Sequence, residues 1–191
     1  MLFRSTWQLS PVPRSEQAGA AAHFASYPLR RLDAEVLIDA LNQITGTTEQ
    51  YSSAIPEPYT FMPDDQRAVA LPDGSISSAF LELFGRPPRD TGLEVERNNR
   101  LTAAQRLHML NSSHVLNKLQ QGPAIQTLIR ANRIPQDLVN ALYLTILSHY
   151  PTEAEGKIVT AHTGAATTKG QTATIDLAWA LINSTEFLYR H

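Results

Sequence analysis

Apolar residues recur at helical spacing along most of the chain. The clearest run covers 32–45, where the apolar positions are Leu32, Val36, Leu37, Leu41 and Ile44. Residues spaced in this way share one face of a helix, so the run predicts an amphipathic helix with a buried stripe. Asp33 and Glu35 lie in its first turn, where the helix dipole favours acids, and Gly46 supplies the stop.

Similar patterns with start and stop signals predict further helices. Thr102 with Gln105 and Thr152 with Glu155 have capping-box spacing, and Pro123 suits a first helical position. The predicted helical segments after the first are 77–84, 102–111, 112–121, 123–132, 135–147, 152–164, 175–183 and a final turn at 184–187. Segment 135–147 is apolar nearly all round, so we expect it to be the central buried helix.

The remaining segments lack this periodicity. Residues 1–30 are typical of an extended arm, whereas 31–191 read as a single helical domain. Within it, 47–75 is a long proline-rich loop, in which 67–71 suit a short strand or extended edge. The small, polar stretch 163–174 is typical of a flexible loop. The predicted fold is all-α, an irregular bundle of about seven or eight helices with little or no strand.

Composition excludes several classes of site. The chain has no cysteine, which removes disulfides, thiolate zinc sites, iron–sulfur clusters and covalently attached c-type haem from it. A net charge of -2 gives no electrostatic footprint for nucleic acid. No apolar run approaches the roughly 18 residues of a membrane span, and the first residues lack the apolar core of a signal peptide. We expect no cofactor, no nucleic-acid partner and no membrane span.

One polar constellation lies between 86 and 97. Glu94 and Glu96 are two apart in an alternating, extended segment beside Arg97, so they could act as acid and base or bind a hard cation. The alternative is a structural clamp in which arginines pair with carboxylates: Arg86, Arg89 and Arg97 with Glu94, Glu96 or Glu35. The clamp is favoured, because catalytic carboxylates need a pocket and a pKa shift that no sequence shows.

Other side chains that could form a metal or catalytic site are better explained by structural roles. The histidines His108, His114, His149 and His162 fall on separate predicted helices without metal-ligand spacing, so no metal site is expected. His108 and His114 are six residues apart across a predicted helix break, so only the turn there could bring them together. Ser112, Ser113 and Ser184 suit helix caps better than nucleophiles, and Trp179 suits the core. Aromatic residues between 51 and 61 are the better candidates for stacking on a polysaccharide.

The stretch FLELFGRPPRDTGLEVERNNRLTAAQRLHMLN resembles the planctomycete-type family catalogued as domain of unknown function 1553, in the C-terminal part of the family domain. Three further stretches resemble the family in the same order: YPLRRLDAEVLIDALNQITG, ALYLTILSHYPTEAE and DLAWALINSTEFLYRH. Two departures stand out. Relatives usually begin with an additional helical segment, so the resemblance suggests a fragment, and they commonly carry cysteines where this chain has Leu93 and Val95.

The resemblance implies a context more than an activity. Family members are typically large exported proteins of the periplasm or cell surface, with a partner domain before this region and often a c-type cytochrome module. We therefore expect a non-catalytic helical interaction or scaffold domain, acting with other domains of a longer protein or as a homo-oligomer. The alternative is a hydrolase or carbohydrate-binding module with its site at Glu94, Glu96 and Arg97.

Overall fold

The computed structural model describes residues 30–53, 55, 61–72, 75–87, 97–98, 100–131, 135–164 and 170–190. Its elements, in chain order, are β1 (Arg30–Arg31), α1 (Ala34–Thr45), the 3-10 helix η3 (Ala68–Ala70), α2 (Ala79–Leu83), α3 (Ala103–Asn111), α4 (Ser113–Gln121), α5 (Pro123–Ala131), α6 (Pro135–Leu147), α7 (Glu153–Gly164), α8 (Gln171–Ile182), α9 (Thr185–Leu188) and β2 (Tyr189–Arg190).

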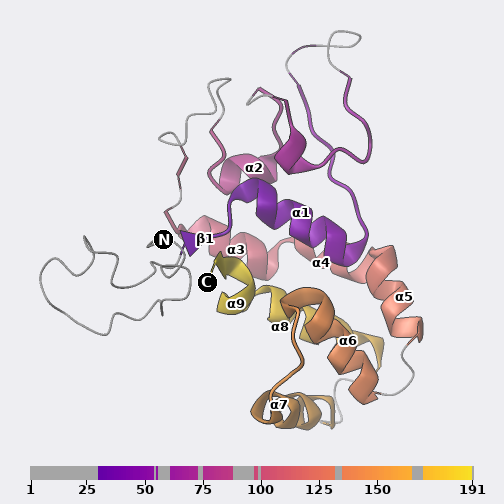
Figure 1. Ribbon diagram of the computed structural model, residues 1–191. Coiled ribbons are helices and arrows are strands. Elements are labelled where there is room, and N and C mark those ends of the chain that lie inside the picture. Colours follow the sequence, from indigo (N-terminus) through magenta and orange to yellow (C-terminus); the bar gives the residue numbers. More distant parts are fainter. Residues whose placement is uncertain are drawn as a thin grey trace, which may run out of the picture.

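The all-α prediction is confirmed. The strands of the described ranges are two residues long, and β1 pairs antiparallel with β2, Arg30 opposite Arg190 and Arg31 opposite Tyr189. The Leu32 N–H continues this contact by donating to the carbonyl of Leu188 at 2.9 Å. This small pairing joins the first and last described elements beside α9 (Figure 1).

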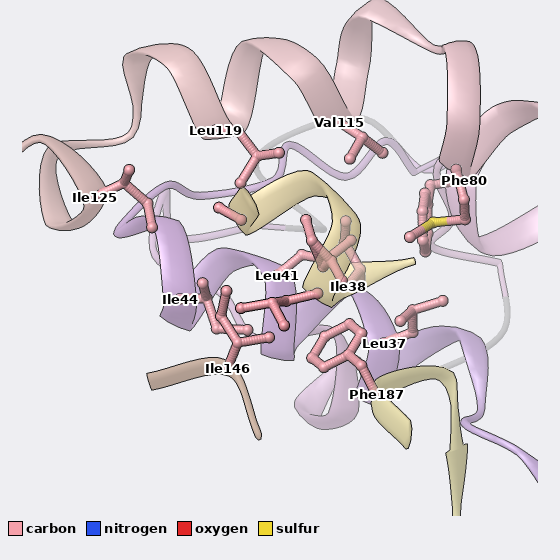
Figure 2. Close-up of a cluster of buried hydrophobic side chains, with 14 of the residues drawn as sticks. Leu37, Ile38, Leu41, Ile44, Phe80, Val115, Leu119, Ile125, Ile146 and Phe187 are labelled. Carbon is pink, nitrogen blue, oxygen red and sulfur yellow. The ribbon is translucent and has the colours of Figure 1, made fainter. Parts of the chain in front are cut away.

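Helix α1 lies at the centre of the described fold. It contacts η3, α2, α4 and α5, which surround it in Figure 1. Its stripe residues Leu37, Ile38 and Leu41 are buried and meet side chains from distant parts of the chain, as Figure 2 shows for Leu119, Ile146 and Phe187. Burying this stripe on several sides stabilises the domain by removing apolar surface from water.

The expectation that 135–147 forms the central buried helix is wrong. The helix exists as α6, but it buries only Leu142, Tyr143 and Ile146, and Leu144 is 40% exposed. Its main contacts are with α5, α8 and α9, and it lies toward one end of the body in Figure 1. Apolar residues all round a helix show that it can be buried, but which helix lies at the centre depends on tertiary packing.

Local start signals are confirmed where the structure describes them. Thr102 Oγ1 accepts from the Gln105 N–H at 3.3 Å, and Gln105 Oε1 accepts from the Thr102 N–H at 3.1 Å, which completes the capping box of α3. Thr152 and Glu155 make the same reciprocal pair, with the Thr152 N–H donating to Glu155 at 2.7 Å. Pro123 is the first residue of α5. These signals are local, so the sequence alone specifies them.

Gly46 ends α1 as predicted, and it has a second role. Its φ of 71° is in the left-handed region, which glycine adopts without a steric cost. A Cβ at this position would lie 2.9 Å from the Cβ of Ala124 in α5. Glycine therefore lets the chain turn while α5 packs closely against the end of α1.

Two predicted loop features are wrong. Within the segment 67–71, Ala68–Ala70 form the 3-10 helix η3 instead of a strand or extended edge, because the Asp39 carboxylate in α1 accepts from the N–H groups of Ala68 at 2.8 Å and Val69 at 3.1 Å. The predicted flexible loop at 163–174 is also too long, since α7 continues to Gly164 and α8 begins at Gln171. The arm predicted for 1–30 lies outside the described residues except for Arg30, which is in β1.

Candidate functional site

The predicted arginine–carboxylate corner centres on Glu35 of α1. Arg97 donates two parallel hydrogen bonds to it, one to Oε2 at 2.8 Å and one to Oε1 at 2.7 Å. Arg86 adds an ion pair from its Nε to Oε1 at 3.3 Å, and the Glu35 side chain is only 9% exposed. The two guanidinium groups thus reach the same carboxylate from the segment that follows α2.

The two arginines of this corner keep the Glu35 carboxyl ionised. Burial alone raises the pKa of Glu35, but the hydrogen bond from Arg97 and the positive charges of Arg97 and Arg86 outweigh it, so the pKa of this carboxyl lies below its usual value. Glu35 is therefore ionised at neutral pH and bound to both arginines. A carboxylate held in this way suits a structural role, because it has no proton to donate and its oxygens are occupied.

A third arginine, Arg31, links β1 to α3 and to the end of α2. Arg31 of β1 is 6% exposed, donates to the Phe84 carbonyl at 2.8 Å and also donates to Gln105 Oε1. Gln105 in turn donates from Nε2 to the Leu83 carbonyl at 2.8 Å. The buried face of α3 at this point is therefore polar, and it holds α2 and β1 together.

The other members of the predicted constellation lie outside the described residues. These are Arg89, Glu94 and Glu96, so the proposed pairing of the two glutamates with the arginines stays a prediction. The structure places Arg86 and Arg97 together on Glu35, the third carboxylate considered for them. The extended segment predicted for 91–97 is described only at Arg97.

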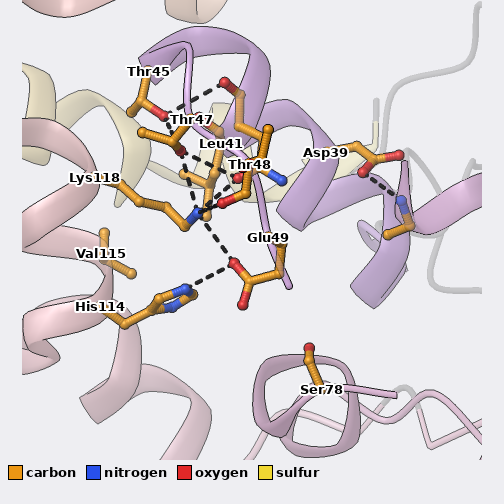
Figure 3. Close-up of polar contacts among 12 residues, drawn as sticks. Asp39, Leu41, Thr45, Thr47, Thr48, Glu49, Ser78, His114, Val115 and Lys118 are labelled. Carbon is orange, nitrogen blue, oxygen red and sulfur yellow. Dashed lines mark hydrogen bonds and ion pairs between the residues drawn. The ribbon is translucent and has the colours of Figure 1, made fainter. Parts of the chain in front are cut away.

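A second polar cluster joins the loop after α1 to α4 (Figure 3). Lys118 is 8% exposed and its ammonium lies close to four acceptors: Asn42 Oδ1 at 2.8 Å, the Thr48 carbonyl at 3.0 Å, Glu49 Oε2 at 3.1 Å and Thr47 Oγ1 at 3.2 Å. His114 Nε2 donates to the same Glu49 oxygen at 2.9 Å. Because these acceptors surround the Lys118 ammonium, the lysine stabilises the conformation of the loop after α1.

Two histidines of this cluster meet across the break between α3 and α4. His108 Nε2 and His114 Nδ1 are 3.4 Å apart, and Ser112 Oγ lies 3.3 Å from the same His108 nitrogen. The ring of Phe80 packs against both imidazoles, with centroids 5.6 Å and 5.8 Å away. Burial and the neighbouring His114 lower the pKa of His108, against the opposing effect of Glu49.

A hollow of about 340 Å³ opens over this cluster. The loop after α1 and helix α4 supply its lining: Thr47, Thr48, Glu49, Gln50, His114, Asn117, Lys118 and Gln121. Burial raises the pKa of Glu49, but the hydrogen bond and charge of His114 and the charge of Lys118 outweigh this and lower it overall. The hollow thus has an ionised carboxylate bonded to an imidazole at its wall.

Sequence reasoning did not find this site. Glu49 lies in the loop, 65 residues from His114, and no local pattern joins them. The available signal was the predicted helix break at Ser112. This break lets His108 and His114, six residues apart on two short helices, approach each other. Within the described ranges, no group of three or more His, Cys, Asp or Glu side chains is placed to hold a metal ion.

The remaining candidates lie elsewhere. Ser112 and Ser184 are caps, accepting from the N–H groups of Val115 and Phe187 at 3.2 Å each. Trp179 is half-buried, and its indole N–H donates to the Leu110 carbonyl at 3.3 Å. In the aromatic loop Phe61 is 74% exposed, whereas Tyr51 packs against the core.

Together these observations define an all-α domain whose described polar clusters hold helices and loops in place. The chain belongs to a family of unknown function: the family model described as "Protein of unknown function (DUF1553)" matches residues 1–163. That match includes three of the four stretches that resemble the family, and the last, 176–191, lies beyond it. No curated protein and no solved structure matches the chain. Across the described residues, no helix is long and apolar enough to cross a membrane.

Proposed function

We propose that this chain is a non-catalytic helical interaction domain, which docks onto a protein partner through the outer face of α3. The observation that carries the proposal is the inverted burial of this helix. Its buried residues are Gln105 and Met109, whereas Leu107 is 57% and Leu110 is 43% exposed. Leucines normally occupy the buried face of a surface helix, so this arrangement needs a reason.

The two leucines form one surface. They are three residues apart and therefore neighbours on the helix, and Leu101, just before α3, is 44% exposed. Trp179 of α8 extends this surface beside Leu110, since its indole bonds to the carbonyl of that residue. Exposed apolar groups that lie together on an otherwise polar helix are typical of a protein-contact surface.

The corner at Glu35 favours this proposal over a hydrolase centred on Glu94, Glu96 and Arg97. Arg97 uses both of its terminal nitrogens on a carboxylate of α1. Its charge therefore stabilises the connection between α1 and the segment after α2, as a structural clamp does. The partner we propose is a further domain of a longer protein or a second copy of this chain.

Site-specific photo-cross-linking tests the proposal in cells that produce the protein. A photoreactive amino acid at position 107 or 110 should give a discrete adduct, and mass spectrometry should assign its second peptide to this chain or to another domain of the same protein. Leu144 of α6 is the matched control, a leucine 40% exposed on a different helix. Absence of an adduct from α3, or the same adduct from position 144, would overturn the proposal.

A further inference from the structure

Helix α3 and the segments that follow it are rich in bases and have no acids. Between 97 and 136 the sequence has six Lys or Arg and no Asp or Glu, so all 18 acids of the chain lie outside this range. Two of the six bases, Arg97 and Lys118, are paired with carboxylates of other segments. Two others, Arg100 and Arg106, are exposed. The outer face of α3 therefore carries positive charge.

These exposed arginines flank the leucines of the proposed docking surface. Arg106 directly precedes Leu107 and is four residues before Leu110, and residues four apart are neighbours on a helix. Arg100 directly precedes Leu101, which is 44% exposed. The surface thus has an apolar centre with positive charge at its edge. A segment that fits it should present an apolar group together with acids.

A loop with this chemistry lies just before η3 in the same chain. Phe61 has the largest exposed fraction of the described large apolar side chains, 74%. Asp64 and Asp65 follow it and are both exposed. We call residues 61–65 the acidic loop. It carries an aromatic ring and two negative charges within five residues, which complements the leucines and arginines of α3.

The acidic loop is held in a fixed position. The Gln66 N–H donates to the Pro63 carbonyl at 3.1 Å and closes the turn that presents the two aspartates. Directly after the turn, η3 is bonded through its N–H groups to the Asp39 carboxylate of α1. A loop that is already ordered loses less conformational entropy when it binds, so more of its contact energy contributes to affinity.

The acidic loop and the α3 surface do not cover each other within one copy. Phe61 is 74% exposed, Leu107 is 57% exposed and Leu110 is 43% exposed. In Figure 1 the segment that leads into η3 lies above α1, whereas α3 lies below it. A second copy supplies the missing half of each contact. With a two-fold axis between the copies, each loop meets the α3 of the other copy, and both surfaces are satisfied at once.

We propose that this chain pairs with a second copy of itself, and that the acidic loop of each copy binds the Leu107 and Leu110 face of α3 in the other. Phe61 packs on the leucines, and Asp64 and Asp65 pair with the Arg106 guanidinium. The inference rests on the docking role proposed for α3 and names the partner of that surface.

Sedimentation of the purified whole chain tests the pairing. The mass should rise with concentration from 21.1 kDa toward twice that value, and added salt should weaken the association by screening the charges. R106E and the double variant D64R/D65R should each raise the dissociation constant at least about 10-fold, because like charges then meet at both contacts. An equimolar mixture of the two variants should associate again, since one contact is then wild type and the other has both charges reversed.

Controls separate this pairing from other causes of association. R130E changes an exposed arginine of α5 and should associate as the wild type does, and circular dichroism checks that each variant is folded. In a mixture of labelled and unlabelled copies, a photoreactive amino acid at position 107 should join the Phe61 peptide of another copy.

A chain that stays monomeric up to about 1 mM, or a mixture of the charge variants that does not associate, would overturn the pairing. The docking role of α3 would survive either result if position 107 formed its adduct in cells with another domain of the same protein. An adduct with neither partner would overturn both proposals.

Discussion

Arg97 and Glu35 form a two-point contact although they are 62 residues apart in the chain, with hydrogen bonds of 2.8 Å and 2.7 Å. Arg86 shares one oxygen of the same carboxylate. The contact joins the most buried helix to the segment that carries the strongest family resemblance. Its geometry makes stability, rather than catalysis, the property that substitutions here should change.

Removing this contact should destabilise the domain. R97A removes two charge-assisted hydrogen bonds and should lower the free energy of unfolding by about 1.5–3 kcal/mol. E35Q leaves two arginines without their carboxylate and should cost about 3–5 kcal/mol. Urea denaturation measures both. K157A is the control, because Lys157 and Glu153 form an exposed i,i+4 pair and its loss should change stability by less than about 0.5 kcal/mol. Equal effects of R97A and K157A would contradict the clamp.

Acid should remove the contribution of Glu35. Its pKa in the folded state lies below the ordinary value of 4.5, so its stabilisation is fully present above pH 4.5 and is lost as the pH falls through the lowered pKa. The difference in unfolding free energy between the wild type and E35Q should therefore be largest at neutral pH and shrink on acidification below 4.5. Denaturation curves at several pH values measure this. The difference between the wild type and L144A should stay constant, because no titrating group is exchanged there.

Two glycine substitutions should act in opposite directions. G46A places a side chain at a φ of 71° and against Ala124, so it should destabilise by at least about 1 kcal/mol. G156A lies in α7, where a Cβ would meet nothing within 4 Å, and should stabilise by about 0.5–1 kcal/mol through helix propensity. Thermal unfolding compares the two variants. A stabilising G46A would show that the close contact of α1 with α5 is looser than described.

The loss of stability caused by core substitutions should show that α1, and not α6, lies at the centre of the fold. L41A empties a fully buried site in α1 and should cost about 2–5 kcal/mol. L144A removes a side chain that is 40% exposed in α6, the helix expected from the sequence to be central, and should cost less than about 1 kcal/mol. Chemical denaturation of both gives the ranking. A larger effect of L144A would restore α6 as the central helix.

The residues that sequence reasoning placed correctly depend on neighbours in the chain. Thr102 with Gln105, Thr152 with Glu155 and Gly46 are caps, and a cap needs only the few residues around it. The all-α class follows from the same local patterns, summed over many segments.

The misplaced features depend on distant partners. Ala68–Ala70 form a 3-10 helix because the Asp39 carboxylate of α1 accepts from the N–H groups of Ala68 and Val69, and no pattern within the loop predicts that contact. The cluster of Glu49, His114 and Lys118 needs the loop after α1 to meet α4, and sequence reasoning missed it for the same reason. The corner was anticipated in part, since Glu35 was one of three carboxylates considered for Arg97.

The pairing of β1 with β2 has a mechanical consequence. Arg30 lies opposite Arg190, so the outer ends of the two strands are side by side. A pulling force applied at these two residues would break the hydrogen bonds of the pair one after another. It would not load all of them at once in shear. The domain should therefore yield at low force from this end, and tension on the chain would reach α1 and α9 before any other helix.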